Sequence, residues 1–153
     1  MVTTDFSTSV TAKTDAMSAF TAIQQVSGWW CNQVSGKSQK SGDEFETRFG
    51  DVHYSKQKLG EVIPGRKMEW LVTDSFLSFL EDKTEWTGTS ILFELEEVGE
   101  QTRIRFTHRG LVPEAECYDA CSPAWMKYLK FSLIPFIERG KGQPGFPPAG
   151  PLK

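Results

Sequence analysis

Apolar and polar residues alternate most regularly between Thr89 and His108, where two runs flank Gly99-Glu100. A two-residue turn with glycine first predicts a hairpin that places Val98 opposite Gln101. Both faces of this hairpin are then chemically consistent, which a slip of one residue would destroy. The register puts apolar residues and a histidine on one face and Glu–Arg pairs on the other: Leu95 with Ile104, Phe93 with Phe106, Ile91 with His108, Glu96 with Arg103 and Glu94 with Arg105.

The N-terminal part of the chain shows a strand pattern followed by a helix pattern. Alternation from Phe6 to Ala12 predicts a strand with one buried face. Asp15 is then a candidate N-cap, apolar residues recur at helical spacing as far as Val26, and Gly28 is a candidate helix stop. We therefore expect a strand followed directly by an amphipathic helix.

A second hairpin is indicated around Gly50-Asp51. If Val52 opens the return strand opposite Phe49, Thr47 faces Tyr54 and both point inward. Leu59 also favours the inner face but has the opposite parity to Tyr54, so either a bulge separates the two or the register differs. Beyond the turn at Pro64-Gly65, a further strand follows with one apolar face, formed by Met68, Trp70 and Val72.

The last regular element predicted is a long helix. Ser122 is expected at the N-cap, Pro123 at the first helical position and Gly140 at the end. Pro135 should kink the helix because it removes one backbone hydrogen bond. One face of the helix is apolar except for a single serine: Trp125, Tyr128, Leu129, Ser132, Leu133 and Phe136.

Together these elements predict an α+β helix-grip fold, in which a curved antiparallel β-sheet wraps around a long C-terminal helix. An apolar sheet face must be covered, and the terminal helix is the only element long enough to cover it. A length of 153 residues is typical of a single domain. We expect one domain over residues 1–143 and a Pro/Gly-rich C-terminal tail over residues 144–153.

Composition and charge exclude several classes of function. A net charge of −3 argues against nucleic acid as a partner. The sequence has no apolar run long enough for a membrane span and no N-terminal signal pattern, so we expect a cytoplasmic protein. Its three cysteines, Cys31, Cys117 and Cys121, are expected to be free thiols.

Candidate catalytic chemistry is sparse. His108 is predicted to point inward near a strand end, where it could hydrogen-bond a ligand, act as acid or base, or simply satisfy a backbone carbonyl. Glu69, Glu85 and Asp74 are interpreted as solvated surface acids, and C-x3-C at Cys117 does not match a zinc pattern. We therefore predict no catalytic residue, metal or cofactor.

Aromatic residues are the strongest candidates for a binding site, because eleven Phe, five Trp and three Tyr can line a large interior. They could form a filled core or a ligand cavity between sheet and terminal helix. Phe76, Leu77, Phe79 and Leu80 form either a strand extension or an exposed patch for a partner or a second copy. The predicted ligand-binding residues are Trp30, Tyr54, Trp70, Phe93, Phe106, His108, Trp125, Tyr128 and Leu129.

Five segments spread over the chain resemble, in sequence and order, the stand-alone members of the heat-shock-protein-90 ATPase activator-homologue family, within the START-like (SRPBCC) superfamily. The resemblance implies the helix-grip fold. The superfamily includes lipid-transfer domains, aromatic-ring cyclases, hormone receptors and chaperone activators. The segments are Pro64-Gly65-Arg66-Lys67-Met68-Glu69-Trp70, Glu85-Trp86-Thr87-Gly88-Thr89, Thr107-His108-Arg109-Gly110-Leu111, Trp125, and Gly140-Lys141-Gly142-Gln143-Pro144.

These observations lead to three functional hypotheses. The first is a binding module for a small hydrophobic or aromatic ligand held under the terminal helix, in a monomer or weak homodimer. The second is a chaperone cofactor that acts through its surface, with a chaperone as partner. The third is a weak enzyme that uses His108.

Overall fold

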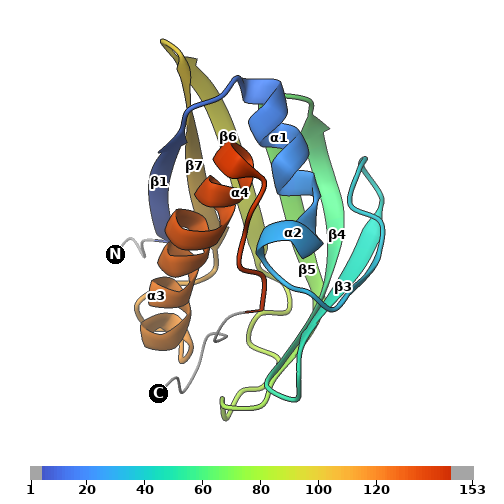
Figure 1. Ribbon diagram of the computed structural model, residues 1–153. Helices are drawn as coiled ribbons and strands as arrows, with labels where there is room; N and C mark the ends of the chain where they lie inside the picture. Colours follow the sequence, from blue (N-terminus) through green and yellow to red (C-terminus); the bar gives the residue numbers. More distant parts are fainter. Residues whose placement is uncertain (1–4, 146–153) are drawn as a thin grey trace.

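The computed structural model describes residues 5–145, and within this range seven strands form one antiparallel sheet (Figure 1). The order across the sheet is β1-β7-β6-β5-β4-β3-β2, so the first strand pairs with the last. The strands are β1 (Phe6–Ala12), β2 (Val34–Gly36), β3 (Glu44–Phe49), β4 (His53–Ile63), β5 (Lys67–Leu77), β6 (Ser90–Val98) and β7 (Gln101–Arg109).

All described helices lie on one face of the sheet, which is its inner face (Figure 1). Two short helices follow β1, and the terminal helix consists of three consecutive segments. The helical segments are α1 (Ala16–Gln24), α2 (Val26–Trp29), α3 (Tyr118–Tyr128), the π-helical turn η1 (Leu129–Leu133) and α4 (Ile134–Arg139). This architecture confirms the predicted α+β helix-grip fold.

The β6–β7 hairpin has the predicted register at every position, from Val98 opposite Gln101 to Ile91 opposite His108. The predicted strand β1 and the N-cap of α1 are confirmed as well, since Asp15 Oδ2 accepts a hydrogen bond from Ser18 N at 3.0 Å. Gly28 is not a helix stop as predicted, because α1 ends at Gln24 and Gly28 lies inside α2.

The predicted register of the β3–β4 hairpin is wrong by one residue. Phe49 lies opposite His53 and Thr47 opposite Ser55, because the turn contains Val52 as well as Gly50 and Asp51. The extra residue reverses the parity of β4, so Tyr54 points to the outer face. The inner face receives His53, Ser55, Gln57 and Leu59, so Tyr54 and Leu59 need no bulge within β4, although the pairing of β4 with β5 does shift register between Lys56 and Gln57.

The start of the terminal helix also differs from the prediction. Helix α3 begins at Tyr118, so Ser122 and Pro123 lie inside it rather than at its N-terminus. Pro135 lies at the start of α4, directly after the π-helical turn. A proline ring clashes with the carbonyl one α-turn earlier, and the wider π-turn gives that carbonyl more room.

The core is shared between the two sets of helices, so the terminal helix does not cover the sheet alone as expected. Trp70 of β5 is completely buried and stacks on Trp29 and Trp30, with ring centroids 6.5 and 5.7 Å away. Trp30 also stacks on Trp125 of α3 at 5.1 Å. The residues after α2 therefore form the middle layer between the sheet and the terminal helix.

Most of the predicted tail, residues 144–153, lies outside the described residues. The described segment that follows α4 packs back on the body of the protein. Gln143 N donates to the buried Ser132 Oγ at 2.6 Å, and Gly145 N donates to Trp30 O at 3.0 Å. Ser132 Oγ in turn donates to Trp29 O, which ties the tail segment to α2.

Candidate functional site

A small cavity lies between α3 and the strands β3 and β4. The volume that the centre of a water molecule can occupy inside it is about 10 Å³, which is enough room for one water. A pocket for an organic ligand is typically about 300 Å³ or more, so this cavity is too small to hold such a ligand in this structure. It is lined by Trp30, Phe49, His53, Trp86, Cys121, Ala124, Trp125 and Tyr128.

Trp86 is the most unusual member of this lining. It belongs to the loop between β5 and β6, yet only 3% of its surface is exposed. The rings of His53 and His108 both meet its indole edge-to-face, each with a centroid distance of 4.8 Å. The Trp86 Nε1–H group is buried and has no acceptor among the described residues. Because buried polar groups are nearly always hydrogen-bonded, this donor requires an explanation.

His108 is fully buried, and both of its ring nitrogens are occupied. Trp125 Nε1 donates to Nδ1 at 3.1 Å, and Nε2 lies 2.9 Å from Thr89 Oγ1. Since Thr89 Oγ1 donates to Trp86 O at 2.6 Å, it accepts from His108 Nε2–H, which fixes the neutral Nε2–H tautomer. Burial, and secondarily the neighbouring His53, lowers the pKa of His108 to about 3. Both nitrogens are therefore engaged by side chains, and His108 does not bond a backbone carbonyl, which was one of the roles considered from the sequence.

A group of polar side chains lies on the inner face of β3–β5 beside the cavity. Ser55 Oγ contacts both Thr47 Oγ1 at 2.7 Å and His53 Nε2 at 2.9 Å. Burial lowers the pKa of His53 to about 3, so this histidine is neutral at physiological pH. Gln57, two residues further along β4, is fully buried, and its Oε1 has no donor among the described residues. The inner face is thus polar in this region, whereas elsewhere it is mainly apolar.

Two acidic residues join the Trp86 loop to the start of α3, and we call this arrangement the carboxylate clasp. The Glu85 carboxylate accepts hydrogen bonds from Glu116 N at 2.7 Å and Cys117 N at 2.9 Å, which holds the two residues that precede α3. The Glu116 carboxylate accepts from Glu81 N at 2.7 Å and Asp82 N at 3.0 Å. These backbone hydrogen bonds lower the pKa of Glu116. Glu85 therefore joins the Trp86 loop to the residues before α3 and is not the free surface acid that the sequence suggested.

The cavity brings together only part of the predicted site. Three predicted residues line it: Trp30, Trp125 and Tyr128. Burial raises the pKa of Tyr128. Five other predicted residues are buried in the surrounding core and do not line the cavity: Trp70, Phe93, Phe106, His108 and Leu129.

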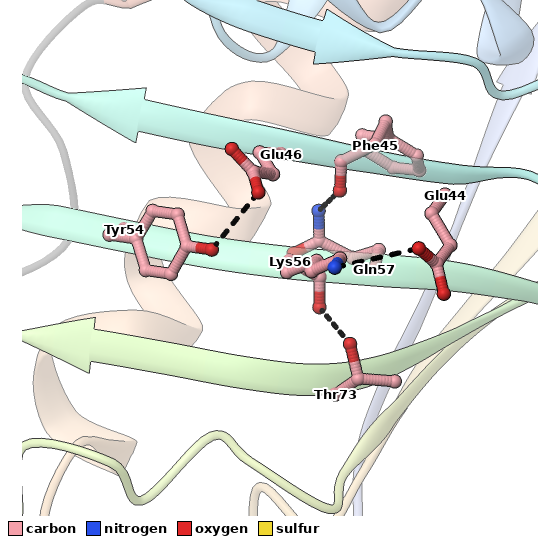
Figure 2. Close-up of polar contacts among 7 residues, drawn as sticks. All are labelled: Glu44, Phe45, Glu46, Tyr54, Lys56, Gln57 and Thr73. Atoms are coloured by element: carbon pink, nitrogen blue, oxygen red, sulfur yellow. Dashed lines mark hydrogen bonds and ion pairs between the residues drawn. The ribbon is translucent and has the colours of Figure 1, made fainter.

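Tyr54 does not belong to the site, because the corrected register turns it outward. Its hydroxyl donates to Glu46 Oε2 at 3.3 Å on the outer face of the sheet (Figure 2). Sequence reasoning missed Phe49, His53, Trp86, Cys121 and Ala124. A correct hairpin register would have pointed to His53. Trp86 lies in one of the segments that carried the family resemblance, but the sequence suggested no role for its side chain.

The cysteines differ from the expectation of three free thiols. Cys117 and Cys121 form a disulfide across the first turn of α3, with their Cα atoms 5.5 Å apart. This pair lies on one helix face because α3 begins before Ser122. Cys31 is a buried free thiol whose Sγ donates to Arg48 O at 3.0 Å.

Between residues 5 and 145, no group of three or more His, Cys, Asp or Glu side chains could hold a metal ion. None of the helices in this range is both long enough and apolar enough to span a bilayer.

Fold and family are defined by comparison with known proteins. The architecture is the START-like helix-grip fold. Residues 15–133 match the family described as Activator of Hsp90 ATPase homolog 1-like protein, and the chain belongs to this family. No curated protein gives a significant match to the chain.

Solved structures extend the comparison over almost the whole chain. The solution structure of the Aha1 dimer from Colwellia psychrerythraea is 28% identical with a TM-score of 0.75, covering 93% of this chain and 100% of that one. A Staphylococcus saprophyticus protein is 14% identical with a TM-score of 0.65, covering 94% and 100%. CalU16 from Micromonospora echinospora is 12% identical with a TM-score of 0.63, covering 92% and 88%. The last two share the fold alone.

Proposed function

We propose that the protein binds a small, neutral, aromatic or apolar ligand in the cavity beside Trp86. The observation that carries this proposal is the buried Trp86 Nε1–H group without an acceptor, on the wall of an otherwise mainly aromatic cavity. Ligand pockets combine apolar walls with a few polar groups that orient the ligand. A ligand with one hydrogen-bond acceptor would supply the missing partner.

The charge of the cavity lining favours a neutral ligand. Its eight lining residues include no Asp, Glu, Lys or Arg, and its one histidine, His53, is neutral. An ionised ligand would therefore lose its hydration without gaining a charged partner in the lining. A planar ring that carries a carbonyl oxygen or an aromatic nitrogen matches this environment best.

Ligand entry requires the cavity to expand, and α3 is the wall expected to move. Cys121, Ala124, Trp125 and Tyr128 contribute the helical side of the lining. The other side consists of the strand residues Phe49 and His53, together with Trp30 after α2 and Trp86 of the β5–β6 loop. The carboxylate clasp holds the N-terminus of α3, and the π-helical turn η1 follows its C-terminus, so α3 can move as one segment between the two.

Two probes of the same shape test this proposal. Quinoline has a ring nitrogen that can accept a hydrogen bond, and naphthalene does not. We expect both to bind and to shift NMR signals of Trp86 and Ala124, with quinoline bound more tightly. The Trp86→Phe variant should remove the preference for quinoline, a loss of about two- to tenfold in affinity. Ala124→Leu should weaken both probes by filling the cavity, whereas the exposed Phe131→Ser on η1 should change neither.

Two results would refute ligand binding at this position. One is the absence of binding by wild type to either probe, in which case Trp86 Nε1 donates to a single buried water. The other is binding that Ala124→Leu does not weaken while the variant remains folded by NMR.

A second candidate function is a chaperone cofactor that acts through its surface. Family membership and the small volume of the cavity both favour it. Titration of the labelled protein with purified heat-shock-protein-90 tests this candidate. Saturable line broadening confined to surface residues, without any response to the aromatic probes, would rank the chaperone-cofactor function above ligand binding.

A further inference from the structure

The outer face of β3–β5 carries an aromatic row formed by Arg48, Tyr54 and Phe76. Tyr54 lies directly opposite Arg48 on β3 and opposite Phe76 on β5. The Arg48 guanidinium carbon sits 4.6 Å from the centre of the Tyr54 ring. On the same face, the Tyr54 hydroxyl points across to Glu46 (Figure 2).

The outer face of β4 and β5 carries three exposed apolar side chains, Phe76, Leu71 and Ile63. Phe76 is 47% exposed, and Leu71, on the same side of the same strand, is 38% exposed. By contrast, the outer positions of β6 and β7 carry the Glu–Arg pairs, and those of β1 are mainly Ser and Thr. Phe, Tyr and Arg in one exposed cluster are a composition typical of the energetic centre of a protein interface.

The charges around the aromatic row identify the kind of partner. On this face Glu44 and Glu46 of β3 lie opposite Lys58 and Lys56 of β4, and with Arg48 and Asp74 the two signs are balanced. Lys56 Nζ and Glu44 Oε1 already lie 3.5 Å apart (Figure 2). A partner surface of a single sign would meet like charges over half of this area. A surface that itself carries both signs can pair with it throughout.

We infer that the partner is a second copy of this chain, docked by the same outer face around a twofold axis. An isologous contact presents identical patches to each other, so each charge can meet its opposite while Phe76 and Leu71 of both copies form the apolar centre. The structural relative from Colwellia psychrerythraea, similar over its whole length, was solved as a dimer. The contact lies on the opposite side of the sheet from the cavity, so it is independent of the ligand proposal.

Sedimentation velocity of the full chain, from about 10 μM to about 1 mM, tests this inference. Wild type should sediment as a reversible dimer at the higher concentrations. Phe76→Glu should raise the dimer dissociation constant at least about tenfold, because it places two carboxylates at the centre of the contact. Phe76→Thr, which keeps a residue suited to a strand, should weaken the dimer less.

The matched control is Phe131→Glu, since Phe131 is 60% exposed and lies on η1, remote from the outer face of the sheet. It should leave the dimer unchanged. Concentration-dependent NMR shifts should fall on the outer residues of β3–β5. A wild type that stays monomeric at 1 mM, shifts confined to another surface, or equal effects of Phe131→Glu and Phe76→Glu would each overturn the inference. If a monomeric wild type bound heat-shock-protein-90 by this face, the occupant would be another protein, and the inference would again fail.

Discussion

The indole N–H of Trp125 donates to Nδ1 of His108 across 3.1 Å of the buried core. This hydrogen bond joins α3 to β7 and sets the tautomer that allows His108 to reach Thr89. It therefore connects the terminal helix, the last strand and the Trp86 loop, which are the three elements around the cavity. His108 is accordingly a structural residue, and its replacement should lower the free energy of unfolding.

We expect His108→Phe to lower the free energy of unfolding by about 1–3 kcal/mol, because the buried Trp125 N–H loses its acceptor. His108→Gln offers both an acceptor and a donor and should lose less. Urea denaturation of the two variants beside wild type makes the comparison. Equal stability of His108→Phe and wild type would mean that the Trp125 hydrogen bond contributes nothing.

Stability should fall with decreasing pH before most carboxylates titrate. Burial holds the pKa of both His53 and His108 near 3, below the unfolded value of about 6.5. Below pH 6.5 the unfolded chain therefore binds protons that the folded protein does not, and stability is lost between about pH 6.5 and 3. Each histidine can contribute a slope of up to about 1.4 kcal/mol per pH unit.

Chemical denaturation at a series of pH values between about 7 and 5 measures this slope, and His108→Gln should reduce it. A slope that is unchanged in the variant would show that His108 titrates normally in the folded state.

Trp70→Ala should destabilise the protein by about 3–5 kcal/mol, because Trp70 is fully buried between Trp30 and Phe93 and its loss leaves a large cavity. Thermal unfolding followed by circular dichroism checks this value. A loss below about 1 kcal/mol is the size expected for a surface residue and would contradict the packing described above.

Loss of the Glu85 hydrogen bonds should destabilise the start of α3. Glu85→Ala leaves Glu116 N and Cys117 N without acceptors, and the expected cost is about 1–2 kcal/mol. Glu116→Ala removes the opposite half of the carboxylate clasp. Because the two halves tie the same pair of loops, the double variant should cost less than the sum of the single ones. Strict additivity in urea denaturation would show that the two carboxylates act separately.

Local sequence rules predicted the elements whose determinants are close together in the chain. The β6–β7 hairpin was predicted residue by residue because its turn is short and both of its faces constrain the register. The β3–β4 hairpin failed because a third turn residue, Val52, changes the parity of every later position. That single residue explains why Tyr54 was wrongly predicted to face inward and why His53 was not predicted as a residue of the site.

Other features could not be read locally because their partners are distant in sequence. Helix α3 starts at Tyr118, just after a Cys117 N–H group held by Glu85, 32 residues earlier, so the nearby Ser122-Pro123 pair was misleading. Trp86 lies in a loop, where no periodicity indicates which side chains are buried. The aromatic composition predicted a tryptophan-rich interior, but the size of the remaining cavity depends on side-chain packing that no pattern encodes.

The carboxylate clasp has a kinetic consequence for how the cavity opens. Glu85 holds the first turn of α3 while Glu116 holds the backbone at Glu81 and Asp82, so neither segment can leave its place without breaking hydrogen bonds of the other. Independent movement of α3 and of the Trp86 loop is therefore disfavoured. Relaxation-dispersion measurements should then give one common exchange rate for amides of the Trp86 loop and of the first turn of α3.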